Sequence, residues 1–279
     1  MNTVEAKVPG LSTVTAWGDI GISADDRSTL VAVAGGFAGS GKAAVGLSAS
    51  TVDEGNTIRA NIDHSTVNSI NGAVKLTAGI KPPATKADPS TIALGTSGIM
   101  LPPFGSSQVV NLTVAGSGAG KFAVGAALSV NVIKNTTEAS ITNVATVTAK
   151  NNVALSAIDS SVIDALALGA AGAGTVGVGA AVSANVITNK ISTLISGSTV
   201  TSTSSTGNIT LDSESSSIIR ALAIGVSGAG DVAVSVSALG NAVANSVTST
   251  VSNSTVKAAG DVVIKAQDIA PGVLPTWML

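Results

Sequence analysis

The chain of 279 residues carries a net charge of −2, with only 11% charged and 2% aromatic residues and no cysteine. This charge argues against nucleic acid as a partner, because nothing would neutralise the phosphates, and the lack of cysteine leaves no disulfide framework. Because Gly, Ala, Ser, Thr and Val dominate, we expect a core of many small side chains between closely stacked sheets.

The N-terminal segment, 1–24, matches the end of a repeat. Ser12-Thr13-Val14 and the run after Gly18 align without a gap on Ser254-Thr255-Val256 and the run after Gly260. An array that opens inside a repeat is expected to be a slice of a longer one. The first twenty residues do not have the pattern of a signal peptide, so an export signal is expected to lie outside this sequence.

Four copies of one unit follow, at 25–107, 108–160, 161–216 and 217–268. Each is built around a glycine turn, and these glycines lie 79, 54 and 56 residues apart: Gly41, Gly120, Gly174 and Gly230. The unit is therefore about 55 residues long, with an insertion in the first copy. After each turn the residue types alternate with a period of two, which predicts a strand.

Within these strands the larger residues are expected to face the core and the smaller ones to form the outer face. The expected inward positions are Ala43, Val45, Leu47, Ala49, Phe122, Val124, Ala126, Leu128, Val176, Val178, Ala180, Val182, Val232, Val234, Val236 and Ala238.

Two polar features recur in the repeats. An asparagine follows each turn at the same distance, at Asn56, Asn135, Asn189 and Asn245. Solenoid turns use asparagine for left-handed backbone or for stacked amides, so we predict a structural ladder. Carboxylates recur at the repeat boundary, at Asp26, Asp159, Glu214 and Asp268. We interpret them as a solvated edge, about 10 to 15 Å apart and too distant to share a metal.

Two segments break the pattern. The insertion at 79–105 holds five of the eight prolines, and because proline is not tolerated inside a central strand, we expect it to leave the stack as a loop. It is read equally well as a functional protrusion or as an inert one. The tail, 269–279, is expected to cap the last rung or to fray.

Short strands separated by turns and repeated in tandem predict an all-β protein, a parallel β-solenoid (β-helix) in which each unit supplies two or three rungs. Its uncapped ends favour self-association into filaments. The alternative is a stacked antiparallel β-meander, because the glycine turn could reverse the chain. The uncharged stretches 165–189 and 232–256 are long enough for membrane helices, but their composition makes membrane insertion unfavoured.

No catalytic, cofactor or metal site is predicted. The run from Gly36 to Lys42 resembles a phosphate-binding loop in letters, but it lacks Ser or Thr after the lysine and leads into a strand, so no nucleotide is expected. The single histidine, His64, is interpreted as a surface residue. A carbohydrate-active enzyme on a β-helix would need clustered acids and bases, and it is kept as the alternative function.

The repeat sequence resembles the tandem strand repeats of bacterial filamentous haemagglutinin-like and autotransporter adhesin passenger regions. The segments that carry the resemblance are GAGTVGVGAAVSANVITN, ISGSTVTS and GNITLDS. The resemblance implies a non-catalytic structural and adhesive part of a very large protein. It also implies a location outside the cell or on the bacterial surface, and a host-surface or extracellular-matrix ligand.

Overall fold

The computed structural model describes residues 1–81 and 107–269, which form strands joined by turns. In this part of the chain no helix is long and apolar enough to cross a membrane. The strands belong to five sheets, A to E, and consecutive strands enter the sheets in the order A, B, C, D, E.

The sheets differ in strand length. Sheet A holds β1 (Thr3–Val8), β6 (Thr57–Asp63), β11 (Thr136–Thr142), β16 (Lys190–Ser196) and β21 (Ser246–Ser252). Sheet B holds β2 (Thr13–Ala16), β7 (Thr66–Ser69), β12 (Thr146–Ala149), β17 (Thr199–Ser202) and β22 (Thr255–Lys257). Sheet C holds β3 (Ile20–Asp26), β8 (Val74–Ile80), β13 (Val153–Asp159), β18 (Ile209–Ser215) and β23 (Val262–Asp268). Sheet D holds β4 (Leu30–Ser40), β9 (Val109–Ala119), β14 (Val162–Ala173) and β19 (Ile218–Ala229). Sheet E holds β5 (Ala43–Glu54), β10 (Phe122–Ile133), β15 (Val176–Ile187) and β20 (Val232–Val243).

Every pairing between the described strands is parallel, and each strand pairs with its equivalent in the next unit. In sheet E, Ala43 pairs with Phe122, Phe122 with Val176, and Val176 with Val232. This arrangement is consistent with a β-solenoid and contradicts the antiparallel meander. The expectation of two or three rungs per unit is also wrong, because one pass through the five sheets, which we call a rung, uses a whole unit.

Sheets A, B and C enclose the main hydrophobic core (the A/B/C core). Its fully buried large side chains include Ile58, Leu76, Ile141, Leu155 and Ile195. Apolar and polar residues alternate along these strands, so one face of each sheet is dry and the other is solvated.

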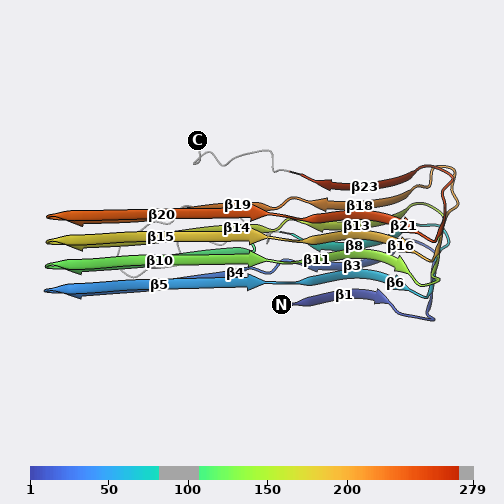
Figure 1. The fold of residues 1–279 in the computed structure, drawn as a ribbon. Coiled ribbons are helices and arrows are strands. Elements are labelled where there is room, and N and C mark those ends of the chain that lie inside the picture. Colours follow the sequence, from blue (N-terminus) through green and yellow to red (C-terminus); the bar gives the residue numbers. More distant parts are fainter. Residues whose placement is uncertain (82–106, 270–279) are drawn as a thin grey trace.

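Sheets D and E form a two-layered sandwich that extends to one side of the A/B/C core (Figure 1). We call this part the D/E sandwich. Two-residue turns join its layers at the far end, which we call the tip; Gly41 and Lys42 form the first of them. The predicted turn glycines therefore all lie at the tip. A Cβ on Gly120, Gly174 or Gly230 would overlap the carbonyl oxygen of the turn glycine one rung earlier, which explains why glycine recurs there.

The side chains between the two layers become smaller towards the tip. Near the A/B/C core the interior holds Ile133, Ile163 and Ile187, and further out it holds Ala127 and Ala167. Still further out come glycines: a Cβ on Gly125 would overlap the Ala170 carbonyl oxygen, and one on Gly169 would overlap that of Ala180.

The predicted facing of the sheet E strands is therefore reversed. Ala44, Ser129 and Ala181 point inward and are buried, whereas Val45 and Leu47 are 53% and 63% exposed. The cause is the close approach of the two layers, which leaves room only for small side chains between them.

The two irregular segments fall mostly outside the described residues. Gly79 and Ile80, expected to begin the insertion, instead complete β8, and the rest of the insertion from 82 onward is not described. Of the tail, only Ile269 is described; its backbone N–H donates to the Ser215 carbonyl at 2.8 Å.

Candidate interaction surface

The outer surface of sheet E is a continuous apolar face, which we call the E face. It consists of the outward residues of β5, β10, β15 and β20: Ala43, Val45, Leu47, Ala49, Thr51, Asp53, Phe122, Val124, Ala126, Leu128, Val130, Val132, Val176, Val178, Ala180, Val182, Ala184, Val186, Val232, Val234, Val236, Ala238, Gly240 and Ala242.

The E face bears a single charged residue, Asp53, which lies on the outermost strand β5 next to the A/B/C core. Large apolar side chains are exposed to solvent across the face: Leu47 is 63% exposed, Leu128 42% and Val236 48%. Monomeric proteins rarely expose contiguous apolar areas of this kind, and such areas mark interaction sites.

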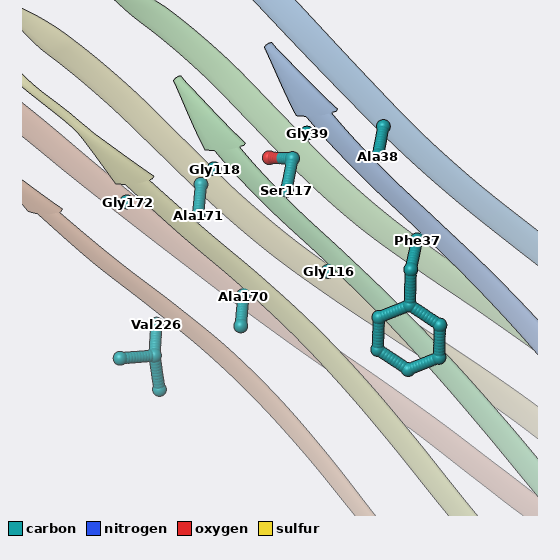
Figure 2. A pocket seen from close by; sticks show the side chains of 10 residues that line it. All are labelled: Phe37, Ala38, Gly39, Gly116, Ser117, Gly118, Ala170, Ala171, Gly172 and Val226. Carbon is teal, nitrogen blue, oxygen red and sulfur yellow. The ribbon is translucent and has the colours of Figure 1, made fainter. Parts of the chain in front are cut away.

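The outer surface of sheet D, the D face, is also apolar but is uneven. A shallow hollow of about 460 Å³ lies near the tip. Gly116 and Ala170 lie along its floor, and Phe37 and Val226 stand at opposite sides of it (Figure 2). The Phe37 ring lies against Gly116, where a Cβ would contact the ring at 2.8 Å. The hollow fits an apolar group, but its lining offers little polar side-chain chemistry.

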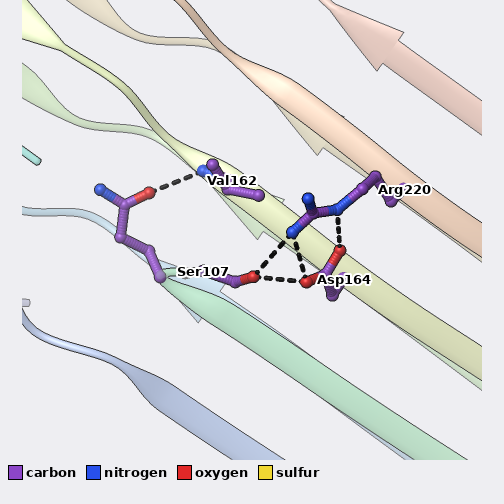
Figure 3. A network of polar contacts seen from close by, with 5 residues as sticks. Ser107, Val162, Asp164 and Arg220 are labelled. Carbon is purple, nitrogen blue, oxygen red and sulfur yellow. Dashed lines mark hydrogen bonds and ion pairs between the residues drawn. The ribbon is translucent and has the colours of Figure 1, made fainter. Parts of the chain in front are cut away.

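At the other end of the D face a charged network crosses the strands (Figure 3). The Arg220 guanidinium donates to both Asp164 carboxylate oxygens, at 2.5 and 2.7 Å, and to the Ser107 hydroxyl at 3.2 Å. The Ser107 hydroxyl also donates to Asp164. Because the Asp164 side chain is only 2% exposed, the bidentate arginine is what makes burial of this carboxylate tolerable. We assign the network a structural role.

The four predicted asparagines lie in one row where sheet E joins sheet A. The side-chain oxygen of each accepts a hydrogen bond from the backbone N–H of the asparagine one rung earlier. The bonds run from Asn56 to Asn135 (2.8 Å), Asn135 to Asn189 (2.9 Å) and Asn189 to Asn245 (2.9 Å). The row continues to Asn2, which donates to Asn56 at 2.9 Å. None of the four has the left-handed backbone that is one of the two expectations for them. Among the described residues that conformation occurs at Leu11, His64, Asn143, Val144, Gly197 and Asn253.

A second ladder lies inside the D/E sandwich and was not predicted. Asn131 donates through its amide nitrogen to Asn185 at 2.7 Å, Asn185 donates to Asn241 at 2.8 Å, and Asn111 of sheet D joins the row by donating to Asn131 at 2.7 Å. The signal was an asparagine eleven positions after Gly120, Gly174 and Gly230. It was overlooked because its side of the strand was expected to face solvent.

The interpretation of the recurring carboxylates as a solvated edge is wrong for two of them. Asp159 is fully buried and Asp26 is 7% exposed. They occupy one column of sheet C, two rungs apart, with Ile80 between them. Glu214 is out of this column by one residue and accepts a hydrogen bond from Gln267. Asp268 is in the column and is exposed.

Burial raises the pKa of Asp159 to about 6, although hydrogen bonds from Ser161 and Asn189 lower it. Burial, followed by the nearby carboxylates of Asp26 and Asp159, raises the pKa of Glu54 to about 7. The Asn56 amide nitrogen donates to both Glu54 and Asp26 at 2.8 Å, so these two carboxyl groups share one donor. This polar junction lies where sheets A, C, D and E meet.

The remaining sequence candidates form no chemical site. His64 is an exposed turn residue with φ 46°, and Lys42 lies in the tip turn between two strands, without the helix N-terminus that a phosphate loop needs. Over residues 1–81 and 107–269, no three His, Cys, Asp or Glu side chains come together in a way that could hold a metal ion.

Comparisons with protein-family models, with curated proteins and with solved structures gave no match.

Proposed function

We propose that the chain is a non-catalytic structural and adhesive module: a β-solenoid of about 55-residue repeats, belonging to a large secreted or surface-attached bacterial protein and stacking end to end. The resemblance of the repeat sequence to adhesin passenger regions supports a large bacterial parent protein that is secreted or attached to the cell surface. The apolar E face, with its exposed Leu47, Leu128 and Val236, supplies a surface to which a partner would adhere.

The observation that carries the stacking is the exposed end of the A/B/C core. Leu76, Leu155 and Leu211 follow one another in sheet C and are at most 1% exposed. Ile264 takes the same position in the last strand and is 50% exposed. Within residues 1–81 and 107–269, β23 and the neighbouring last strands of the other sheets have no strand paired to their outer edge. Such edges pair with further strands.

The test is negative-stain imaging with sedimentation velocity over a range of concentrations. We expect rods whose length grows with concentration. Ile264→Lys places a charge in the stacking surface and should leave particles that are only one unit long, whereas Val144→Lys, an exposed turn position in a middle rung, should leave the rods unchanged. Single particles at every concentration for the wild-type protein would refute end-to-end stacking.

A further inference from the structure

The E face is large enough for a stable protein interface. Its four strands β5, β10, β15 and β20 each have 12 residues. At ~3.3 Å per residue and ~4.8 Å between strands, the face measures about 40 by 19 Å, or ~760 Å². A standard-size interface buries about 800 Å² on each partner. The face thus matches one side of such an interface.

The charges around the E face favour one arrangement of two copies. Lys42, Lys121, Thr175 and Asp231 follow one another across the tip, each turn bonded to the one before it. A two-fold axis parallel to the strands reverses this order in the opposing copy. Lys42 of one copy then faces Asp231 of the other, and Lys121 faces Thr175.

We propose that the E face pairs with the E face of a second copy about a two-fold axis that runs parallel to the strands, between β10 and β15. Such an isologous contact closes on itself and limits the assembly to a dimer across this face. Leu128 of one copy lies over Val182 of the other, because these two residues are neighbours across the axis. This lateral contact is independent of the stacking proposed above, which uses the ends of the sheets.

The other in-plane two-fold axis, along the stacking direction, is disfavoured by charge. It places the tip of one copy over the opposite end of the E face in the other. Lys121 would then face Lys134, which follows directly after β10 and is exposed. Opposed like charges at an interface suppress that orientation.

A lipid surface is the competing occupant of an apolar face, and the charges at the tip count against it. Lys42, Lys121 and Asp231 border the face at the tip and would have to be kept out of the lipid. A second copy covers the face and leaves these tip charges in water.

Thiol cross-linking tests both the contact and its axis, and the natural lack of cysteine removes any background. Leu128→Cys lies near the middle of the face, and Phe122→Cys lies at its tip end. With the proposed axis, a short bismaleimide links two copies at either position. With the other axis Phe122 lies over the far end, about 40 Å away, and only Leu128→Cys is linked. Leu222→Cys on the D face is the control and should remain unlinked.

The second measurement is the dissociation constant of the pair by sedimentation equilibrium, in the Ile264→Lys background that prevents stacking. Leu128→Lys buries an unpaired charge from each copy and should weaken the pair by at least about a hundredfold. Leu222→Lys is a matched leucine of similar exposure, 45% against 42%, on the opposite face. It should leave the dissociation constant unchanged.

Cross-linking at both positions, with loss of the dimer in Leu128→Lys alone, would support the proposal. Linkage at Leu128→Cys only, or at neither position, would overturn it. Flotation of the wild-type protein with phosphatidylcholine vesicles, accompanied by loss of the cross-link, would overturn it in favour of a lipid surface.

Discussion

Asp159 illustrates how a single buried carboxyl group makes the fold sensitive to pH. Its Oδ1 accepts hydrogen bonds from the Ser161 backbone and hydroxyl and from the Asn189 amide, whereas its Oδ2 is 3.5 Å from the Thr137 hydroxyl. The donors compensate only part of the desolvation, so the pKa remains raised, at about 6 rather than 3.8.

We therefore expect Asp159→Asn to stabilise the protein at neutral pH. Because the pKa of Asp159 is raised in the folded protein, this carboxyl group ionises at a lower pH in the unfolded chain. The wild type therefore loses on the order of 3 kcal/mol of stability from this group as the pH rises from about 4 to 6. An asparagine keeps the Oδ1 contacts, and its amide nitrogen can donate to Thr137. Urea unfolding should show the variant more stable at pH 7.5 and equal to wild type near pH 4. Asp268→Asn, in the same column but exposed, is the control; a variant less stable at both pH values would contradict the argument.

At the scale of the elements, the spacing of sheets D and E depends on glycines that meet carbonyl oxygens across the sandwich. Gly169 of β14 lies against Ala180 of β15, whereas Gly172, three residues further along β14, has open space where a Cβ would be. The two positions are therefore a matched pair that differs in what lies opposite.

We expect Gly169→Ala to lower the free energy of unfolding by roughly 1 to 3 kcal/mol or more, because the added methyl must push the layers apart. Gly172→Ala should be neutral or slightly stabilising, since it reduces the entropy of the unfolded chain. Chemical denaturation of both variants measures the difference. Equal stabilities would show that the two layers are not held at this separation.

Much of the strand pattern could be predicted from the sequence. The errors concern which face of a strand is buried, and they have a physical cause. Alternation at Val176–Val186 predicts a strand whichever side is buried, because a period of two states only that the faces differ. The larger side chain was assigned to the interior, as in an ordinary sheet packed on a core. Here glycine backbones touch instead, so Val178 faces outward and Gly179 inward. The Asn131 ladder was missed for the same reason, whereas the burial of Asp159 was missed because a recurring carboxylate was assigned to a solvated edge.

At the scale of the whole molecule, stability is expected to vary along the stack. Each rung contacts only its neighbours, so an end rung has half the contacts of a middle one. Side chains of β20 are exposed along its whole length, whereas alternate residues of β10 are buried. The repeat period alone could not predict this one-rung-per-unit layout, because about 55 residues could equally well form several shorter coils.

Hydrogen exchange should therefore show the slowest amide exchange in β10 and β15 and the fastest in β20 and β23, since opening is easiest where one neighbour is missing. The measurement is made on dilute protein and compared with concentrated protein. Protection of β23 should rise with concentration if units stack. Uniform protection along the chain at every dilution would contradict a stack of nearest-neighbour rungs.

The parallel register also determines how the protein would respond to mechanical force. The hydrogen bonds between rungs lie along the stack, whereas the covalent chain circles around it, so tension between the two ends peels rungs away one after another. Equivalent residues of successive rungs are 54 or 56 residues apart in the regular units. Each detached rung therefore releases a contour length of ~180 to 190 Å. A stalk of this construction would yield in equal steps, dissipating a pull over many small ruptures before the whole array is lost.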